Sequence, residues 1–195
     1  MVSNKADTDL WDEERLVSLL KQGHEGAYRA LIRQYKTRLF SIAYGITMDR
    51  EESLDIVQDV FLKVSQHIHS FKGNARLSTW LHRITVNQCL NWQRRWKRRF
   101  RWHHQPLEGD ESGDYPELAT EDSGPETLYE EKELGKLFRE KLNRLPQETR
   151  AVFVLKEVEG LSYDEIADIL KLKRGTVSSR LFYARQTLRA SLKST

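Results

Sequence analysis

Apolar residues recur at steps of three and four along most of this chain of 195 residues, which is the spacing of one face of an α-helix. The apolar stripes predict helices over residues 16–22, 27–46, 54–68, 81–92, 134–145, 152–158, 163–170 and 175–189. Turn-forming residues at 71–76 interrupt the pattern, and Ser78 or Thr79 is expected to cap the helix that follows. Runs that alternate apolar and polar residues, as strands do, are few. The pattern therefore predicts an all-α chain.

Residues 103–125 have no apolar period and are rich in glycine, proline and acidic side chains. Such a segment cannot bury enough apolar surface to offset the entropy lost on ordering. We therefore expect two small helical domains, at residues 1–102 and 128–195, joined by a flexible acidic linker at 103–127.

Charge is distributed in nearly the same three parts. The formal net charge is only +3, from 32 Lys and Arg against 29 Asp and Glu. Residues 1–102 carry a net +7, residues 103–133 a net −10 and residues 134–195 a net +6. Two basic blocks on either side of an acidic one are typical of two polyanion-binding units and a connector.

Several functional classes are disfavoured by what the sequence lacks. No apolar run reaches the roughly 18 residues that a bilayer span needs, and the first residues are too polar for a signal peptide. The single cysteine, Cys89, cannot form an internal disulfide, and no Cys/His spacing suggests a zinc site. No glycine-rich phosphate loop or nucleophile–base pair is present. We expect a cytoplasmic protein that is not an enzyme, needs no cofactor or metal and does not insert into a membrane.

The C-terminal part has the pattern of a DNA-binding helix-turn-helix. Ser162 and Glu165 form a capping box before an apolar helix, a short turn follows at 171–174, and a second helix is expected over 175–189. The outward side of that second helix carries donors suited to base edges and phosphates: Thr176, Ser178, Ser179, Arg180, Tyr183 and Arg185. The alternative is a solvated basic face on an ordinary helical hairpin.

A second basic stretch ends the first domain. Six cations crowd eight positions, at Arg94, Arg95, Lys97, Arg98, Arg99 and Arg101. Their clustering favours phosphate binding, whereas core packing is favoured for Trp92 and Trp96 of the same helix. The loop just before this helix places polar side chains beside Trp80, an arrangement that could hold an unstacked base.

These motifs resemble extracytoplasmic-function bacterial sigma factors. The segment FKGNARLSTWLHRITVN, residues 71–87, is similar to their promoter-melting segment, and DIVQDVF, residues 55–61, to their polymerase-binding helix. Residues 145–150, 159–162 and 175–181 resemble their sigma domain 4. The resemblance covers roughly residues 24–100 and 128–192, and the separate motifs occur in the order of the family.

The resemblance implies two sigma domains, core RNA polymerase and promoter DNA as partners, and an anti-sigma factor that masks the polymerase-binding faces. The polymerase would be bound by Asp55, Gln58, Asp59 and Phe61. The minus-10 element would be melted and held by Asn74, Arg76, Trp80, Arg83 and Asn87, with Arg94 and Arg95 on adjacent duplex phosphates. The minus-35 element would be bound by Arg174, Thr176, Ser178, Ser179, Arg180, Tyr183 and Arg185.

Three positions depart from the family pattern. Leu54 stands where an acid commonly precedes Asp55, Lys171 where glycine is common in the turn, and Lys173 where a capping serine is frequent. The last two are expected to weaken the turn and cap by about 1 kcal/mol, or to add phosphate contacts instead.

Two further hypotheses follow from the sequence. The rival function is a helix-turn-helix transcriptional regulator that binds duplex DNA without polymerase, although no dimer seam or ligand-binding motif supports it. The acidic linker is expected either to mimic nucleic acid and thread a basic channel of the polymerase, or to serve only as a soluble spacer. Replacing its acids with Ser or Asn should alter initiation or promoter escape in the first case.

Overall fold

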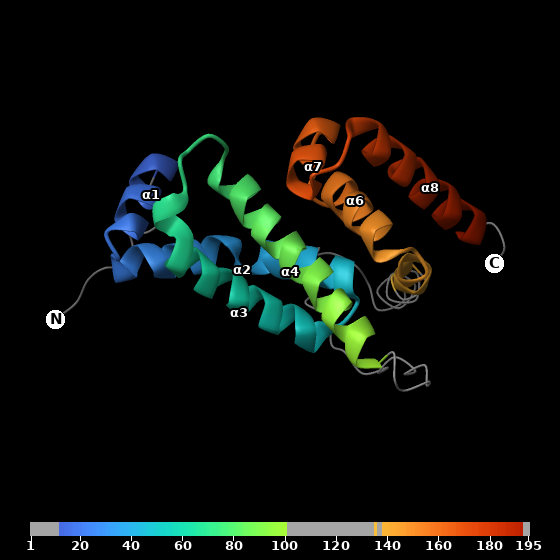
Figure 1. Ribbon diagram of the computed structural model, residues 1–195, viewed down its shortest axis with the longest axis horizontal. Coiled ribbons are helices and arrows are strands. Elements are labelled where there is room, and N and C mark those ends of the chain that lie inside the picture. Colours follow the sequence, from blue (N-terminus) through green and yellow to red (C-terminus); the bar gives the residue numbers. More distant parts are fainter. Residues whose placement is uncertain (1–11, 101–134, 136–137, 193–195) are drawn as a thin grey trace, which may run out of the picture.

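The computed structural model describes residues 12–100, 135 and 138–192, and every regular element in those ranges is a helix (Figure 1). The side chains of Gln93, residues 96–100 and residues 191–192 are not described. The predicted acidic linker at 103–127 and the hypothesis about its path lie outside the described residues, as does the prediction for Arg101.

Four α-helices and one short 3-10 helix build an N-terminal domain. They are α1 (Glu13–Lys21), α2 (Glu25–Thr47), α3 (Arg50–His67), η1 (Ile68–Ser70) and α4 (Leu77–Phe100). The apolar stripes predicted from the sequence face one another in a shared core, where Leu39, Ile42 and Leu81 are each 0% exposed. Apolar burial of this kind fixes the three long helices relative to one another.

The corner between α2 and α3 is set by local polar contacts. Met48 takes the left-handed conformation with φ 61, which ends α2. Asp49 then caps α3 by accepting from the Glu52 amide at 3.0 Å, and the buried hydroxyls of Thr47 and Ser53 lie 2.9 Å apart. Thr47, Asp49 and Ser53 thus satisfy one another's polar groups across this corner.

The start of α4 differs from the prediction. The helix begins at Leu77, so Ser78 and Thr79 lie in its first turn and neither is its cap. The reason is a contact from α1: the Glu13 carboxylate accepts from the Leu77 amide at 2.8 Å. Lys21 donates to the Phe71 carbonyl at 2.8 Å, so α1 supports both ends of loop 71–76.

A C-terminal domain follows, formed by residues 138–143, which are helical, α6 (Gln147–Glu157), α7 (Tyr163–Leu170) and α8 (Arg174–Leu192). The predicted capping box of Ser162 and Glu165 is present with both reciprocal hydrogen bonds. The predicted inward face of α8 is also confirmed, since its four apolar members are buried: Val177, Leu181, Ala184 and Leu188. At the end of α6, Val158 lies outside the apolar face and is 60% exposed.

The two domains lie against each other, α6 on α2 and α7 on α4 (Figure 1). Gly45 permits the close approach of α2 and α6, because a Cβ there would lie only 2.9 Å from Val154 Cγ2. Arg150 of α6 donates its Nε to the Ile46 carbonyl at 2.8 Å, and Gln147 donates to the Cys89 carbonyl at 3.2 Å. The described structure is thus a closed arrangement of the two domains.

Candidate polymerase and nucleic-acid interfaces

The outer face of α3 carries three of the four residues predicted to bind polymerase. Asp55, Gln58 and Asp59 are exposed and occupy positions i, i+3 and i+4, so they lie on one side of the helix. Asp59 is held in place by Gln88 of α4, whose Nε2 donates to its Oδ2 at 3.2 Å. The helix thus presents two carboxylates and an amide to solvent from a rigid support.

Two neighbouring apolar residues of α3 differ in their exposure. Phe61 packs partly against the core, whereas Leu62 is 57% exposed and lies seven positions after Asp55, on the same side. The sequence reasoning missed Leu62, although its spacing from Asp55 was a usable signal. Leu54, where the family commonly has an acid, is half-buried and does not add to the exposed face.

Loop 71–76 and the first turns of α4 form an open pocket of about 160 Å³. It is lined by Ser70, Phe71, Lys72, Gly73, Asn74, Ala75, Thr79, Trp80 and Arg83. Gly73 has φ +75, a conformation that lets the loop turn back on α4. The buried Phe71 ring fixes Trp80, with ring centroids 5.3 Å apart and planes tilted by 46°. The structure therefore brings an indole, a guanidinium and amide groups to one pocket.

The other residues predicted for the minus-10 element spread along α4. Arg76, which follows Ala75 of the pocket lining, and Asn87, four positions after Arg83, are exposed. Arg94 and Arg95 are also exposed, but eleven or more positions after Arg83, which is about 16 Å along a helix axis. Asn74, Trp80 and Arg83 thus meet at the pocket, Arg76 and Asn87 lie outside its lining, and Arg94 and Arg95 form a separate basic end of α4.

The outward side of α8 presents the residues predicted for the minus-35 element. Ser178, Ser179 and Tyr183 are exposed, whereas Thr176 is half-buried. Two arginines are oriented by glutamates of α6. Arg180 contacts Glu148 at 2.5 Å. Arg185 contacts Glu157 at 2.6 Å. Arg174 lies 3.4 Å from Asp164, a pair too exposed to contribute much.

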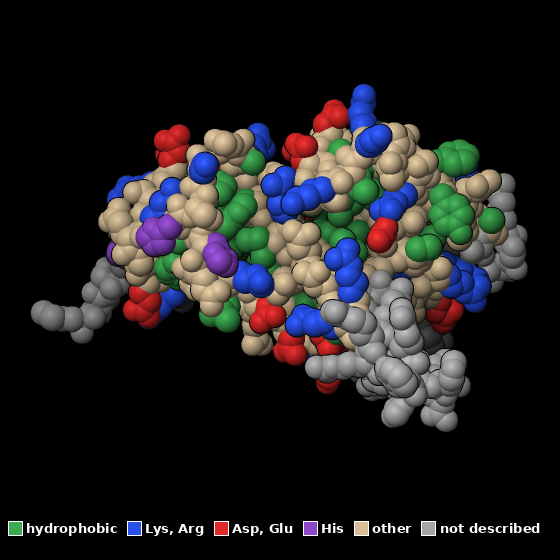
Figure 2. Space-filling view, viewed as in Figure 1, with side chains coloured by type: hydrophobic (Ala, Val, Ile, Leu, Met, Phe, Trp, Pro, Cys, Tyr) green, Lys and Arg blue, Asp and Glu red, His purple; other side chains and the backbone are tan. Residues whose placement is uncertain are grey.

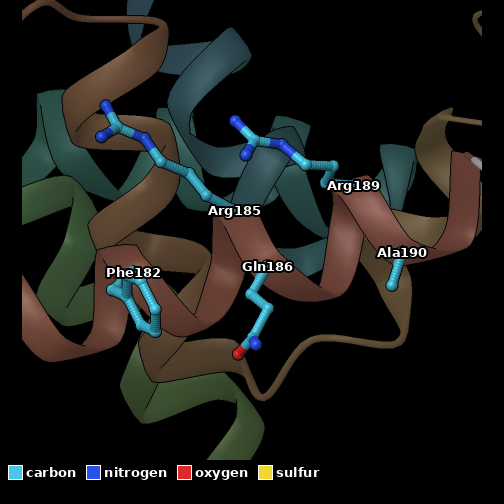
Figure 3. Close-up of a pocket in the computed structure, with 5 residues that line it drawn as sticks. All are labelled: Phe182, Arg185, Gln186, Arg189 and Ala190. Atoms are coloured by element: carbon cyan, nitrogen blue, oxygen red, sulfur yellow. The ribbon is translucent and has the colours of Figure 1, made fainter.

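Phe182 is the residue of α8 that the sequence reasoning missed. Its side chain is 69% exposed, and it follows Ser178 by four positions, on the same outward side. It lines a shallow cavity of about 550 Å³ with Arg185, Gln186, Arg189 and Ala190 (Figure 3). Figure 2 shows apolar side chains over α8 and Lys and Arg side chains gathered over the middle of the same face, where α4 and α7 meet.

Comparison with known proteins decides the family. Models of sigma-70 region 2 and sigma-70 region 4 match residues 31–99 and 136–188. The ECF RNA polymerase sigma-E factor of Haemophilus influenzae is 31% identical over 176 residues, covering 90% of this chain and 93% of that protein. This chain belongs to the extracytoplasmic-function sigma factors of the sigma-70 family. As a member of that family, it is a transcription initiation factor, as the sequence predicted.

Other relatives agree with this assignment. The ECF RNA polymerase sigma factor SigE of Mycolicibacterium smegmatis is 36% identical over 159 residues, and the match spans 82% of this chain but 59% of that protein. The fold matches the sigma factor RpoE of Bartonella quintana, solved in complex with the anti-sigma factor NepR, with a TM-score of 0.69 and 23% identity over 85% of this chain and 96% of that one. The fold also matches CnrH, solved in complex with the cytosolic domain of CnrY, with a TM-score of 0.63 and 20% sequence identity. That match covers 93% of this chain and 97% of CnrH. The predicted two-domain helical fold is confirmed.

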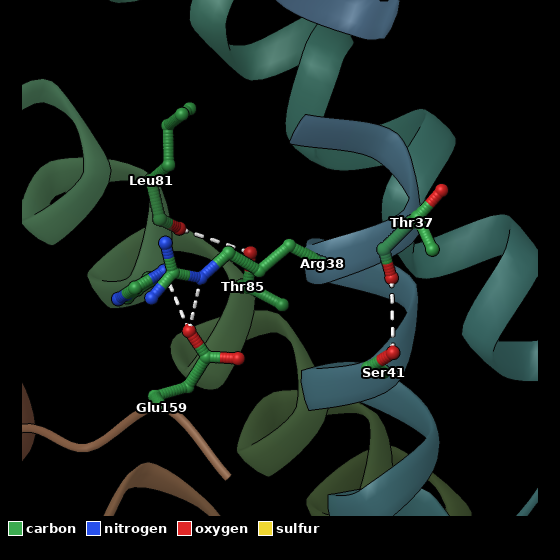
Figure 4. Close-up of polar contacts among 7 residues, drawn as sticks. Thr37, Arg38, Ser41, Leu81, Thr85 and Glu159 are labelled. Atoms are coloured by element: carbon green, nitrogen blue, oxygen red, sulfur yellow. Dashed lines mark hydrogen bonds and ion pairs between the residues drawn. The ribbon is translucent and has the colours of Figure 1, made fainter. Parts of the chain in front are cut away.

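A charged cluster lies where the two domains of this sigma factor meet. The Glu159 carboxylate, in the turn between α6 and α7, is 3% exposed and accepts from Arg38 of α2 (Figure 4). The same carboxylate lies 3.5 Å from His82 Nε2 of α4. Burial, and then the nearby Arg38 charge, lower the pKa of His82 to about 4, so the imidazole is neutral at pH 7.

Two other buried groups have pKa values that burial shifts in opposite directions. Burial raises the pKa of the Cys89 thiol to about 12, which suits the packed, unreactive role expected for it. Burial lowers the pKa of Arg150 to about 10, so its guanidinium stays protonated at neutral pH. Within the described residues no cluster of three potential metal ligands occurs, and no described helix is long and apolar enough to cross a membrane.

Proposed function

We propose that this sigma factor binds core RNA polymerase through α3, directs it to promoters with minus-35 and minus-10 elements, and melts the minus-10 element. The finer parts of this function rest on three surfaces of the described structure: the α3 face, the pocket at loop 71–76 and the outward side of α8. The pocket is the observation that carries the proposal, because a duplex-binding regulator has no need of a cavity lined by an indole, amides and a guanidinium.

The chemistry of the pocket fits an unpaired base. Trp80 is half-buried and held by Phe71, so it offers a fixed aromatic surface, and stacking on such a surface contributes about 1–3 kcal/mol per base. Asn74 and Arg83 supply donors and acceptors at its rim. On this proposal, the energy of stacking and hydrogen bonding offsets the cost of unpairing the first bases of the minus-10 element.

Run-off transcription with core polymerase tests the proposal. Genomic fragments from the bacterium that carries this chain are transcribed with and without the protein, and the new start sites define its promoters. Promoter-selective transcripts that need both components support the sigma function. Tight sequence-specific duplex binding by the protein alone, with no such transcripts, would instead favour the polymerase-independent regulator.

Premelted templates then separate the two DNA surfaces. We expect Trp80→Ala to lower initiation on duplex promoters and to be rescued when the minus-10 region is opened by mismatches. Substitution of Arg180, on α8, should not be rescued by the same template, because its role is on the minus-35 duplex. Equal rescue of both variants would contradict the assignment of melting to the pocket.

We also propose an anti-sigma partner and a cytoplasmic site of action. The support is that two proteins of the same fold, RpoE of Bartonella quintana and CnrH, were solved in complex with an anti-sigma factor and with the cytosolic domain of CnrY. A pull-down of the native sigma factor from its own bacterium, followed by inhibition of run-off transcription by the purified partner, tests this assignment.

A further inference from the structure

Helix α1 bonds both ends of the loop that forms the pocket. Glu13, in its first turn, accepts from the Leu77 amide through Oε1 at 2.8 Å. Lys21, in its last turn, donates from Nζ to the Phe71 carbonyl at 2.8 Å. Phe71 and Leu77 are buried, at 7% and 0% exposure, whereas residues 72–76 between them are all exposed. Two bonds from one helix therefore fix the points where the loop leaves and re-enters the domain.

The sequence of α1 explains how one short helix reaches both points. Leu16 and Leu20 are 3% and 0% exposed, so they hold α1 in the core of the N-terminal domain, where it lies against η1 just before the loop (Figure 1). Asp12 caps α1 itself by accepting from a first-turn amide at 2.9 Å, which leaves Glu13 available as a cap elsewhere. Glu13 and Lys21 are eight positions apart, about 12 Å along a helix axis, so each serves one end of the loop.

The bond from Glu13 has the chemistry of a helix cap. The first amides of an α-helix have no partner within the helix, and a carboxylate that accepts from one of them also faces the positive end of the helix dipole. Arg76, directly before α4, has no acceptor in its side chain, and the acceptor comes instead from 64 positions earlier. The helix that carries Trp80 and Arg83 therefore starts where Glu13 holds it.

The bond from Lys21 acts on the aromatic wall of the pocket. Lys21 is half-buried and bonds the carbonyl of Phe71, whose ring centroid lies 5.3 Å from that of Trp80. Trp80 is the surface proposed to stack on a base, so a shift of the Phe71 backbone would move its support. Neither Glu13 nor Lys21 lines the pocket, and each acts on it through a residue at one end of the loop.

We propose that Glu13 and Lys21 are positioning residues for the minus-10 element, which hold loop 71–76 in the shape that receives an unpaired base before the DNA arrives. This inference rests on the proposed function, because it takes the pocket as the site of that base. A base gains from stacking only in molecules whose pocket is already formed, so a loop that is formed less often captures it less tightly in proportion. Loss of either bond should therefore weaken melting, although neither residue contacts the base.

Hydrogen exchange of the full-length chain, followed by mass spectrometry, tests whether α1 holds the loop. Glu13→Ala removes the acceptor, and we expect peptides that cover residues 71–80 to exchange about fivefold faster, the factor that loss of a helix cap typically produces. Glu13→Gln keeps an oxygen that can accept from the Leu77 amide, so it should retain most of the protection. Glu14→Ala is the matched control in the same turn of α1, and peptides from α3 are the internal reference.

Run-off transcription then tests whether the bonds serve melting. On a duplex promoter, Glu13→Ala and Lys21→Met should each lower initiation by a similar factor, and a template with a mismatched minus-10 region should restore it. Damage to the fold at large would instead lower transcription from both templates. Glu13→Ala combined with Trp80→Ala should be no worse than Trp80→Ala alone, because Glu13 acts through the pocket. Glu14→Ala and Lys36→Met, on the exposed side of α2, should match the native chain.

Three results would overturn the inference. They are unchanged exchange at residues 71–80 in Glu13→Ala, an equal loss of transcription on duplex and mismatched templates, and an additive loss in the double variant. A native chain that gives no promoter-dependent transcripts would overturn the initiation function instead. The exchange measurement then still decides whether α1 holds the loop, since faster exchange in Glu13→Ala supports that role and unchanged exchange contradicts it.

Discussion

Helices α2 and α4 each face the N-terminal core on one side and the C-terminal domain on another, and the two sides carry different residues. Toward the N-terminal core they present Leu39, Ile42 and Leu81, all fully buried among other apolar side chains. Toward the C-terminal domain they present Arg38 and His82, together with the backbone of the residues around Gly45. The contact with the C-terminal domain therefore includes polar and charged groups beside apolar ones such as Val154, which packs on Gly45.

Apolar and polar contacts differ in how much free energy their loss costs. Burying a leucine side chain contributes about 1.5–3 kcal/mol relative to leaving it in water, and no alternative partner exists for it in solution. A polar contact exchanges with water, and a buried polar atom without a partner costs about 1–3 kcal/mol. We therefore expect the core to be the more costly of the two to disrupt.

The largest expected effect is in the core. Leu39→Ala should lower the free energy of unfolding of the N-terminal domain by about 2–5 kcal/mol, because it leaves a cavity where the side chain is 0% exposed. Urea denaturation measures the loss. Ile32→Ala on the same helix is the control, since Ile32 is 39% exposed and its loss should cost much less. Equal losses would contradict the assignment of Leu39, and not Ile32, to the core.

Arg150→Met should have the next largest effect, because Arg150 bonds backbone carbonyls in both domains. The buried guanidinium donates to the Ile46 carbonyl of one domain and to the Leu142 and Asn143 carbonyls of its own. Removing it leaves carbonyls of two helix ends without a donor, which should cost about 2–3 kcal/mol in urea denaturation.

Small-angle X-ray scattering separates the loss of stability from the loss of the contact between the domains. We expect Arg150→Met to increase the radius of gyration as well as to lower stability, because the contact with α2 is lost. Arg144→Met, at an exposed position two residues before Pro146, should change neither quantity. A destabilised Arg150→Met variant that stays as compact as the native chain would restrict the role of Arg150 to its own domain.

Acid should open the domain contact through His82. The groups facing this imidazole are Arg38 of α2, Glu159 of the α6–α7 turn and Glu165 of α7. Its pKa is about 4 when buried and about 6.5 when exposed, so the open or unfolded form binds more protons between those values. The contribution of His82 to the stability of the closed form is therefore fully present above about pH 6.5. It decreases as the pH drops, by about 1–2 kcal/mol at pH 5.

The radius of gyration measured from pH 7 to pH 5 checks this expectation. The native chain should extend as the pH falls, and His82→Gln should respond less, because its side chain does not titrate. A pH response that is identical in the two proteins would assign the effect to carboxylates elsewhere.

The helices of both domains could be predicted from the sequence because each has a regular apolar stripe and recognisable ends. The stripe of α8 predicted its four buried residues, and the Ser162–Glu165 spacing predicted the capping box. These features depend on neighbours three or four positions apart, which a sequence displays directly. Several motifs that occur in the order of the sigma factor family then allowed the family to be predicted.

Contacts between distant residues could not be predicted in the same way. The start of α4 depends on Glu13, which lies 64 positions earlier, and the closed arrangement depends on Arg38 reaching Glu159, 121 positions later. Neither pair has a local spacing rule. Exposed apolar side chains are intermediate cases: Leu62 and Phe182 could have been found by asking which apolar residues share a face with the proposed polar contacts.

The smallest expected effect lies in the turn between α7 and α8, outside both the core and the domain contact. Lys171 has φ 53, a left-handed conformation that costs a residue with a side chain about 1–2 kcal/mol and costs glycine little. Lys171→Gly should therefore raise the melting temperature of the C-terminal domain, whereas Lys171→Ala, which removes the same charge but keeps a Cβ, should not. Since neither substitution touches the contact with α2 or α4, the radius of gyration should stay at the native value in both. A Lys171→Gly chain with a higher melting temperature and an unchanged radius of gyration would show that two quantities are independent. They are the stability of the C-terminal domain and the stability of its contact with the N-terminal domain. A larger radius of gyration in the Lys171→Gly variant would show instead that the turn itself maintains the closed form.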